Sequence, residues 1–422
     1  MAKKTKSSQP VGPLAERPKV SRAQKTREVQ EAITASALEL LAANGVDGLA
    51  LTKIAAHAGM SNGPLYGRYD SAEDVALELW ESKLRDHYAL LIREFNEFAS
   101  SPTAAPSEWL INELTRPSEL TCGAIEVVAV ARRFPLLVDS VRSDIEVLFR
   151  ELCEINELLP KALVTVRMTI PTGCVLTSRM VPKSRPPWRD ILLRIRDASL
   201  DPTTWLEDLD WPNPTPLVMP TPSTGDAGLD EFVSAVMAVV AKVGFEKTTA
   251  HRVARAAGHS FSSAYTHVGT KDELMHTAIA QMIEQIWRTG TTAFVSLDDD
   301  SYIRSAFALQ RGLVAPENRQ LRQLRVETVI ATRHHPDLAS VSQLRITEAL
   351  SWIREIFGTK DSAVIESPTS FWYLTNAHGI GMVSLSLLTD CFSEINWAPI
   401  GAVANQIANT TTLTPLRELG KI

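Results

Sequence analysis

Two distant segments of the sequence repeat one pattern, and this repetition limits the folds available to the chain. When the sequence is shifted by 199 residues, residues 31–75 lie over residues 230–274 without a gap. The identical pairs are Ala42/Ala241, Gly45/Gly244, Ala55/Ala254, Ala58/Ala257, Gly59/Gly258, Ser61/Ser260 and Tyr66/Tyr265. Further along, residues 132–137 match residues 333–338 at a shift of 201. One long period of this kind predicts two related units of roughly 200 residues rather than a solenoid of short repeats.

Each repeat opens with an amphipathic helix followed by a short one. In the first repeat, apolar residues recur at three- and four-residue spacing, which predicts a helix from Arg22 to a stop at Asn44-Gly45. A short helix is predicted over residues 51–57, and its counterpart over residues 250–256. Both short helices lead into an Ala-Gly turn.

The turn and a third helix complete a helix-turn-helix. Ala55 permits two helices to cross closely, Gly59 suits the positive φ of the turn, and Ser61 is expected to N-cap the next helix. That helix, at residues 62–69, is too short to bury itself. We therefore expect its N-terminal residues to form a probe that enters the major groove of DNA.

The first repeat resembles the TetR family of one-component regulators. The matching residues are Thr52, Ile54, Ala55, Ala58-Gly59-Met60-Ser61, Gly63, Leu65-Tyr66, Tyr69, Ser71 and Glu73. The second repeat matches more weakly, through Val253-Ala254, Ala257-Gly258, Ser260, Tyr265 and Lys271-Asp272-Glu273-Leu274. The resemblance implies an all-α fold of two TetR-like units, each with an N-terminal helix-turn-helix and a helical ligand-binding and dimerisation domain. The two units are expected to form an intramolecular pseudo-dimer.

The expected domains follow from the repeats and from a proline-rich break between them. They are a disordered basic tail (1–21), a first DNA-binding domain (22–74), a first helical domain (75–200), a proline-rich linker (201–228), a divergent second DNA-binding domain (229–273) and a second helical domain (274–422). A long helix is predicted from Val75 to Phe98, and Pro135 and Pro336 are expected to open two more. Several prolines within 201–228 argue against a regular helix there.

The resemblance also implies which residues meet DNA in the first repeat: Arg22, Lys25, Thr52, Lys53, Ser61, Asn62, Gly63, Pro64, Tyr66 and Arg68. Arg68 is the best reader of base identity, because its guanidinium can pair with guanine O6 and N7. Tyr66 is expected at a phosphate. Ala72 stands where the family usually has a lysine, so one phosphate contact is missing there.

The second repeat departs further from the family. Its candidate DNA contacts are His251, Arg252, Ser260, Phe261, Ser262, Ser263, Tyr265, His267 and Lys271. The segment at the start of the second repeat, Asp226 to Glu231, is acidic. The N-terminal segment of the chain, residues 1–30, instead carries eight basic and two acidic residues. Phe261 either meets a thymine methyl group or is buried against a partner.

The remaining composition narrows the class of protein. The net charge of −6 means that any surface for nucleic acid must arise from local clustering. Four scattered cysteines without a C-x-x-C pair favour a reducing cytoplasm over a disulfide framework or a zinc site. No secretory signal or membrane span is recognised, so a cytoplasmic location is expected. His334-His335 is expected to be a surface corner rather than a metal site.

The sequence therefore predicts a DNA-binding transcriptional repressor that responds to a small apolar effector and reads an operator with unequal half-sites. Candidate effector contacts are Trp372, Tyr373, Asn376 and His378, although aromatic stripes of this kind also form cores and dimer interfaces. No cofactor and no catalytic residue is expected, because common nucleotide-binding and hydrolase motifs are missing. In the alternative, only the first helix-turn-helix reads DNA, and two chains must pair as a homodimer.

Overall fold

The computed structural model describes residues 21–178, 180, 188–205, 217–219, 221–259, 277, 280–281, 283–284, 302–356, 362–392 and 395–408. All regular secondary structure in these residues is helical, which confirms the predicted all-α class. No helix among the described residues is both long and apolar enough to span a membrane.

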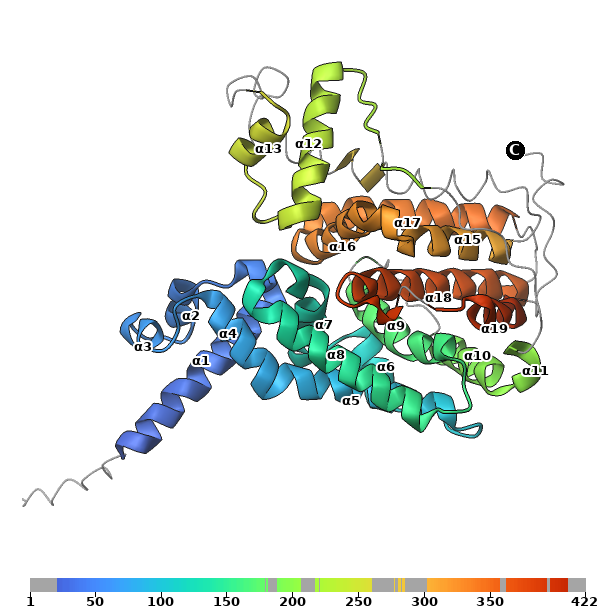
Figure 1. The fold of residues 1–422 in the computed structure, drawn as a ribbon, viewed down its shortest axis with the longest axis horizontal. Coiled ribbons are helices and arrows are strands. Elements are labelled where there is room, and N and C mark those ends of the chain that lie inside the picture. Colours follow the sequence, from blue (N-terminus) through green and yellow to red (C-terminus); the bar gives the residue numbers. More distant parts are fainter. Residues whose placement is uncertain are drawn as a thin grey trace, which may run out of the picture.

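The N-terminal half runs from a three-helix tip into a helical body (Figure 1). Its elements are α1 (Arg22–Asn44), η1 (Val46–Gly48), α2 (Leu51–His57), α3 (Gly63–Tyr66), α4 (Ala72–Leu79), the π-helical turn η2 (Trp80–Leu84), α5 (Arg85–Ser100), α6 (Glu108–Thr115), α7 (Glu119–Val130), η3 (Ala131–Arg133), α8 (Pro135–Ile155), α9 (Lys161–Thr177), α10 (Trp188–Leu200) and α11 (Pro202–Trp205). The helix predicted from Val75 is thus interrupted by one π-helical turn, in which Trp80 is fully buried.

The C-terminal half repeats the order of a helical tip and a helical body. Its elements are α12 (Ala227–Val243), α13 (Ala250–Ala256), α15 (Tyr302–Val314), η5 (Pro316–Asn318), α16 (Arg319–His334), α17 (Pro336–Ile356), α18 (Ser362–Ser386), η6 (Asp390–Phe392) and α19 (Ala398–Ala408). α12 stands on α16 with α13 beside it (Figure 1). The bounds of α13 agree with the predicted helix over residues 250–256.

The two halves share one continuous apolar core. It extends from Ile33 in α1 to Ile407 in α19, while a separate small core under α12 contains Phe232 and Val240. α9 and α18 lie side by side at the centre of the molecule (Figure 1). Their backbones approach closely enough that a Cβ atom at Gly173 would lie 1.8 Å from the carbonyl oxygen of Ala377.

Part of the expected linker is ordered against the body. α11 begins at Pro202, in a region where the prolines argued against any regular helix, and that part of the prediction is wrong. Proline is tolerated at the first position of a helix because no hydrogen bond is needed from its nitrogen there. Leu217 is buried in the main core, so this stretch is not simply a solvated spacer.

Candidate nucleic-acid interface

Three helices form a small scaffold at the N-terminal tip. Ser21 caps α1, its Oγ accepting a hydrogen bond from the backbone N–H of Gln24 at 3.1 Å. Apolar residues of α1, α2 and α3 are fully buried against one another, namely Ile33, Ala37, Leu41, Ile54, Ala55 and Leu65. Gly59 has a φ of +66°, as the predicted turn requires. The sequence thus folds as the expected helix-turn-helix.

The probe helix α3 is a single turn. Its N-cap is Asn62, and no side chain caps it, so the prediction that Ser61 caps this helix is wrong. Pro64 occupies the second position of the helix and has no N–H for a capping oxygen to bind. The turn is instead closed by backbone hydrogen bonds from Leu65 and Tyr66 to the carbonyl of Asn62.

The predicted contacts of the first repeat all lie in or next to this scaffold. Tyr66 is 57% exposed, and Lys25, Thr52, Lys53, Ser61, Asn62, Gly63 and Arg68 are exposed as well. Pro64 is half-buried, and Arg22 is the first residue of α1. Within this short helix Leu65 is buried and Tyr66 is exposed. Their contacts with DNA remain predictions.

Tyr69 anchors the end of the probe segment, a role that the sequence does not reveal. Its hydroxyl accepts a hydrogen bond from Gln30 of α1 at 2.8 Å and donates one to Glu78 of α4 at 2.9 Å. Gln30 also donates to Glu78 at 2.5 Å. Burial raises the pKa of Tyr69, so the hydroxyl keeps the proton that it donates. This triad ties the segment after α3 to two longer helices.

α4 in turn connects the tip to the body. Ser71 and Asp74 form a capping box at its start. Glu73 accepts a hydrogen bond from the backbone N–H of Leu136 in α8 at 2.6 Å. The indole of Trp80 donates to Asp144 of α8 at 2.8 Å. These two hydrogen bonds join α8 to α4 and to the π-helical turn η2 that follows it.

The second repeat shows the same local geometry as far as it is described. Gly244 and Gly258 have φ of +85° and +71°. Arg252 donates to the carbonyl of Lys247 at 2.7 Å, as Lys53 does to that of Gly48 at 3.4 Å. His251 and Arg252 are exposed. The other candidates lie outside the described residues: Ser260, Phe261, Ser262, Ser263, Tyr265, His267 and Lys271.

The candidate effector contacts lie on α18. Trp372, Tyr373 and His378 are buried, and Asn376 is half-buried. The ring of Tyr373 packs against Trp372, with centroids 5.2 Å apart, and against Trp188 at 6.4 Å. These contacts favour packing between the halves over a lining of either helical domain.

His378 has one buried ring nitrogen without a partner in the described part of the chain. Its Nδ1 lies 2.7 Å from the Thr169 hydroxyl of α9, while Nε2 has no hydrogen-bond partner among the described residues. Burial lowers the pKa of His378 to about 4, so its imidazole is neutral near pH 7.

Comparison with known proteins identifies the N-terminal tip. Residues 33–79 match the family described as bacterial regulatory proteins, tetR family. These residues form a TetR-family N-terminal DNA-binding domain. The TetR-family match begins in α1 and ends with α4, so it includes the probe helix, Tyr69, Glu78 and Glu73, whereas Gln30 lies just before it.

Two other comparisons add little to this identification. A transcriptional regulator from Rhodococcus sp. Rha1 is similar over 43% of this chain and 95% of its own, with 16% identity and a TM-score of 0.33. No curated protein matches the chain. Among the described residues, no group of three His, Cys, Asp or Glu side chains is placed to hold a metal ion.

Proposed function

We propose that the chain is a ligand-responsive transcriptional repressor that reads an operator with unequal half-sites through two helix-turn-helix segments. The observation that carries the proposal is the TetR-family domain with its exposed probe. Leu65 is buried and holds α3 in place, while Asn62, Tyr66 and Arg68 remain free to meet a groove or a phosphate.

The contact between α9 and α18 supports the pairing of two units within one chain. A Cβ atom at Gly173 would meet the carbonyl of Ala377 at 1.8 Å, and one at Gly381 would meet that of Thr169 at 1.9 Å. A single shift of 208 residues relates Gly173 to Gly381 and Thr169 to Ala377. Such reciprocity is the property of an interface built around a twofold axis.

Pairing of two units within one chain affects both the strength of their association and the spacing of their probes. A covalent linker gives each unit an effective concentration of about millimolar for the other. Two probes held in this way read half-sites about 34 Å apart, one turn of the double helix. Because the candidate contacts of the two repeats differ in chemistry, their half-sites are expected to differ in sequence.

The proposed effector is a small, mostly apolar molecule bound by the helical domain of either unit. It acts by favouring a conformer in which the spacing of the probes no longer matches successive major grooves. The hydrogen bond from Leu136 of α8 to Glu73 of α4 supports this mechanism, because it links a body helix to the DNA-binding domain. Trp372, Tyr373, Asn376 and His378 stay as candidates for effector contacts.

The alternative is a regulator whose second segment has become a dimerisation or regulatory domain. The acidic N-terminal part of α12 favours it, and one of its acids, Glu231, pairs with His259 at 2.8 Å directly after the α13 turn. This chain would bind DNA only as a dimer. Mass in solution, measured together with protection of whole and half operators, separates the two functions.

The decisive experiment is selection of bound sequences from random double-stranded DNA by the purified chain. The proposal predicts enrichment of two unequal half-sites at one fixed spacing, protected by a single chain. A single enriched half-site, bound by two chains, would support the alternative. If no sequence is enriched, the chain is not a sequence-reading regulator.

A further inference from the structure

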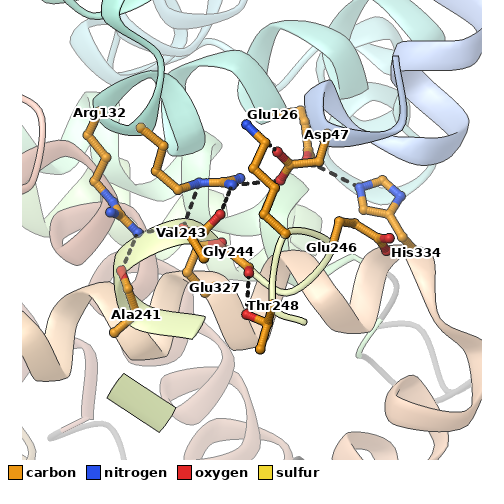
Figure 2. Close-up of polar contacts among 12 residues, drawn as sticks. Asp47, Glu126, Arg132, Ala241, Val243, Gly244, Glu246, Thr248, Glu327 and His334 are labelled. Carbon is orange, nitrogen blue, oxygen red and sulfur yellow. Dashed lines mark hydrogen bonds and ion pairs between the residues drawn. The ribbon is translucent and has the colours of Figure 1, made fainter. Parts of the chain in front are cut away.

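Seven ionisable side chains are buried between the two halves, and together they form what we name the crossed charge cluster. Its members are Asp47, Glu126, Arg132, Arg133, Glu327, Arg333 and His334. Figure 2 labels five of them: Asp47, Glu126, Arg132, Glu327 and His334. Each of these side chains is at most 8% exposed. The expectation that His334 belongs to a surface corner is therefore wrong, because the contact between the halves covers it.

The cluster repeats the sequence relation between the halves. Glu327 of α16 contacts two cations of the N-terminal half, Arg132 and Arg133, with Arg133 Nε 3.0 Å from Glu327 Oε1. Glu126 of α7 contacts the residues that correspond to them at a shift of 201: Arg333 at 3.5 Å and His334 at 3.2 Å. Each glutamate therefore contacts the two adjacent basic residues of the opposite half.

His334 and Arg133 also reach the ends of the opposite helix-turn-helix segments. His334 Nδ1 donates to the carbonyl of Ala43, near the end of α1, at 2.9 Å. Arg133 Nη1 donates to the carbonyl of Val243, the last residue of α12, at 2.8 Å. The last carbonyls of a helix lack partners within it and carry partial negative charge, so both N–H donors are favoured there. Each half thus caps the first helix of the other half's DNA-binding segment.

The glycine after each of these helices brings the backbone directly against the cluster. Gly45 and Gly244 both have positive φ, which disfavours any residue with a side chain. A Cβ atom at Gly45 would lie 2.6 Å from Glu126 Oε1, and one at Gly244 would lie 2.2 Å from Arg133 Nη1. Neither segment can therefore shift along the body without displacing charged groups.

Stability alone does not account for this arrangement. Removing paired charges from water usually costs as much as their attraction returns, so buried ion pairs seldom add net stability. Arg133 Nη2 and Glu327 Oε2 have no hydrogen-bond partner among the described residues. The apolar contact of α9 with α18 already holds the halves together. Buried ion pairs instead favour one relative position of the two halves, because any shift would leave a charge without its partner.

We infer that the crossed charge cluster sets the placement of the two helix-turn-helix segments relative to each other, with His334 and Arg133 as its positioning residues. This inference rests on the proposed function of two reading segments in one chain. The cluster joins both segments to α7 and α16, so movement between these body helices changes the separation of the two segments.

The test is a distance measurement that needs no DNA. Spin labels are attached at Ala56 of α2 and Ala256 of α13, both exposed, after Cys153 and Cys391 are replaced by serine. Pulsed electron resonance then reports the distribution of distances between the segments. The parent chain is expected to give one narrow distribution.

His334→Ala and Arg133→Met each remove one cross-half cap and should broaden this distribution. Loss of one such hydrogen bond changes the ratio of docked to undocked segments by about fivefold to thirtyfold. His334→Arg should restore the narrow distribution, because arginine already makes the equivalent contact at position 133. The matched control is Arg93→Ala, which breaks an exposed pair with Glu151 away from the cluster and should change nothing.

Unchanged widths in folded His334→Ala and Arg133→Met chains would overturn the inference. If those two variants fail to fold, Glu126→Gln keeps the shape of the glutamate, and broadening with a cooperative melt would still support it. Loss of the cooperative melt in Glu126→Gln as well would mean that the cluster determines the fold rather than placement. A parent chain with one narrow distance that selects no DNA sequence would overturn the proposed function only.

Discussion

Replacing Gly173 by alanine is expected to separate the two central helices of the molecule. The added Cβ atom would lie 1.8 Å from the carbonyl oxygen of Ala377, whereas real Cβ atoms are essentially never found closer than 3.0 Å to such a neighbour. The backbones of α9 and α18 must then move apart by at least about 1.2 Å, the difference between these distances. Neither backbone can yield by a side-chain rotation.

Two opposing effects decide the size of the change. Overpacking a filled core costs about 1–3 kcal/mol, and a radial gap of about 0.5–1 Å forfeits a quarter to a half of the dispersion attraction across it. Every residue of α9 from Ala162 to Thr177 is buried, so we expect a cost near 3 kcal/mol, at the upper end of that range. Alanine gains about 1 kcal/mol over glycine inside a helix. The net loss is therefore about 2 kcal/mol.

The assay is urea denaturation followed by circular dichroism, with a control on the facing helix. Gly379→Ala adds the same methyl group to α18, but its nearest neighbour would be Gln310 Nε2 at 3.5 Å, an ordinary contact. This control should gain up to about 1 kcal/mol from helix propensity. Gly381→Ala should lose stability as Gly173→Ala does, because its Cβ would lie 1.9 Å from the carbonyl of Thr169.

Comparing Gly173→Ala with Gly379→Ala shows whether the reasoning is wrong. If helix propensity alone mattered, Gly173→Ala and Gly379→Ala would shift the unfolding midpoint in the same direction. Equal stabilisation of both variants would show that α9 and α18 do not meet backbone to backbone, and the argument for a reciprocal contact between the halves would fail with it.

Three further substitutions test the DNA-binding domain and the crossed charge cluster. Arg68→Ala should cost about 1–3 kcal/mol of binding free energy and relax preference at one base position, and equal weakening for every competitor DNA would contradict base reading. Tyr69→Phe removes the hydrogen bonds of Tyr69 with Gln30 and Glu78 and should lower stability by about 1 kcal/mol, measured by amide exchange in α3. Burial raises the pKa of Glu327 to about 7, against the lowering effect of Arg133 and Arg132, so this carboxyl binds more protons in the folded than in the unfolded chain between about pH 4.5 and 7. Glu327 alone therefore lowers stability as pH rises, by at most about 1.4 kcal/mol per pH unit, whereas the lowered pKa of His378 acts in the opposite direction between about pH 4 and 6.5. Glu327→Gln should accordingly make stability rise more steeply with pH than in the parent, and an unchanged pH profile would contradict the raised pKa.

The helix-turn-helix of the first repeat could be predicted because its signals are local. An apolar stripe, a glycine at position 45 and a second glycine at 59 fix where α1 ends and where the turn lies, and the structure agrees at both points. The capping of α3 was mispredicted for an equally local reason. Pro64 removes the N–H that a capping side chain would bind, so the preference for serine before a helix has no effect there.

The crossed charge cluster could not be predicted, because its partners lie almost 200 residues apart. Glu126 does stand out as an acid within the apolar run of α7, Glu327 is the one acid of α16, and the two correspond at one shift of 201. That signal marks a buried charge in need of a partner, yet it does not say which cation supplies it. His334 was placed at a surface corner because the sequence gives no sign that α1 of the other half covers it.

The chemistry of the cluster explains how the second segment can differ from the first and still be held in an equivalent place. The caps between the halves end on backbone carbonyls, those of Ala43 and Val243, and any residue supplies a carbonyl. Only the glycines that follow, at 45 and 244, are tied to one residue type, since their φ is positive and a Cβ atom would strike the cluster. The contacts that set placement therefore impose no demand on the residues that would read bases. Because positioning and base recognition use different residues, the two segments can keep one fixed separation while their base-contacting residues differ. An operator with unequal half-sites requires this property.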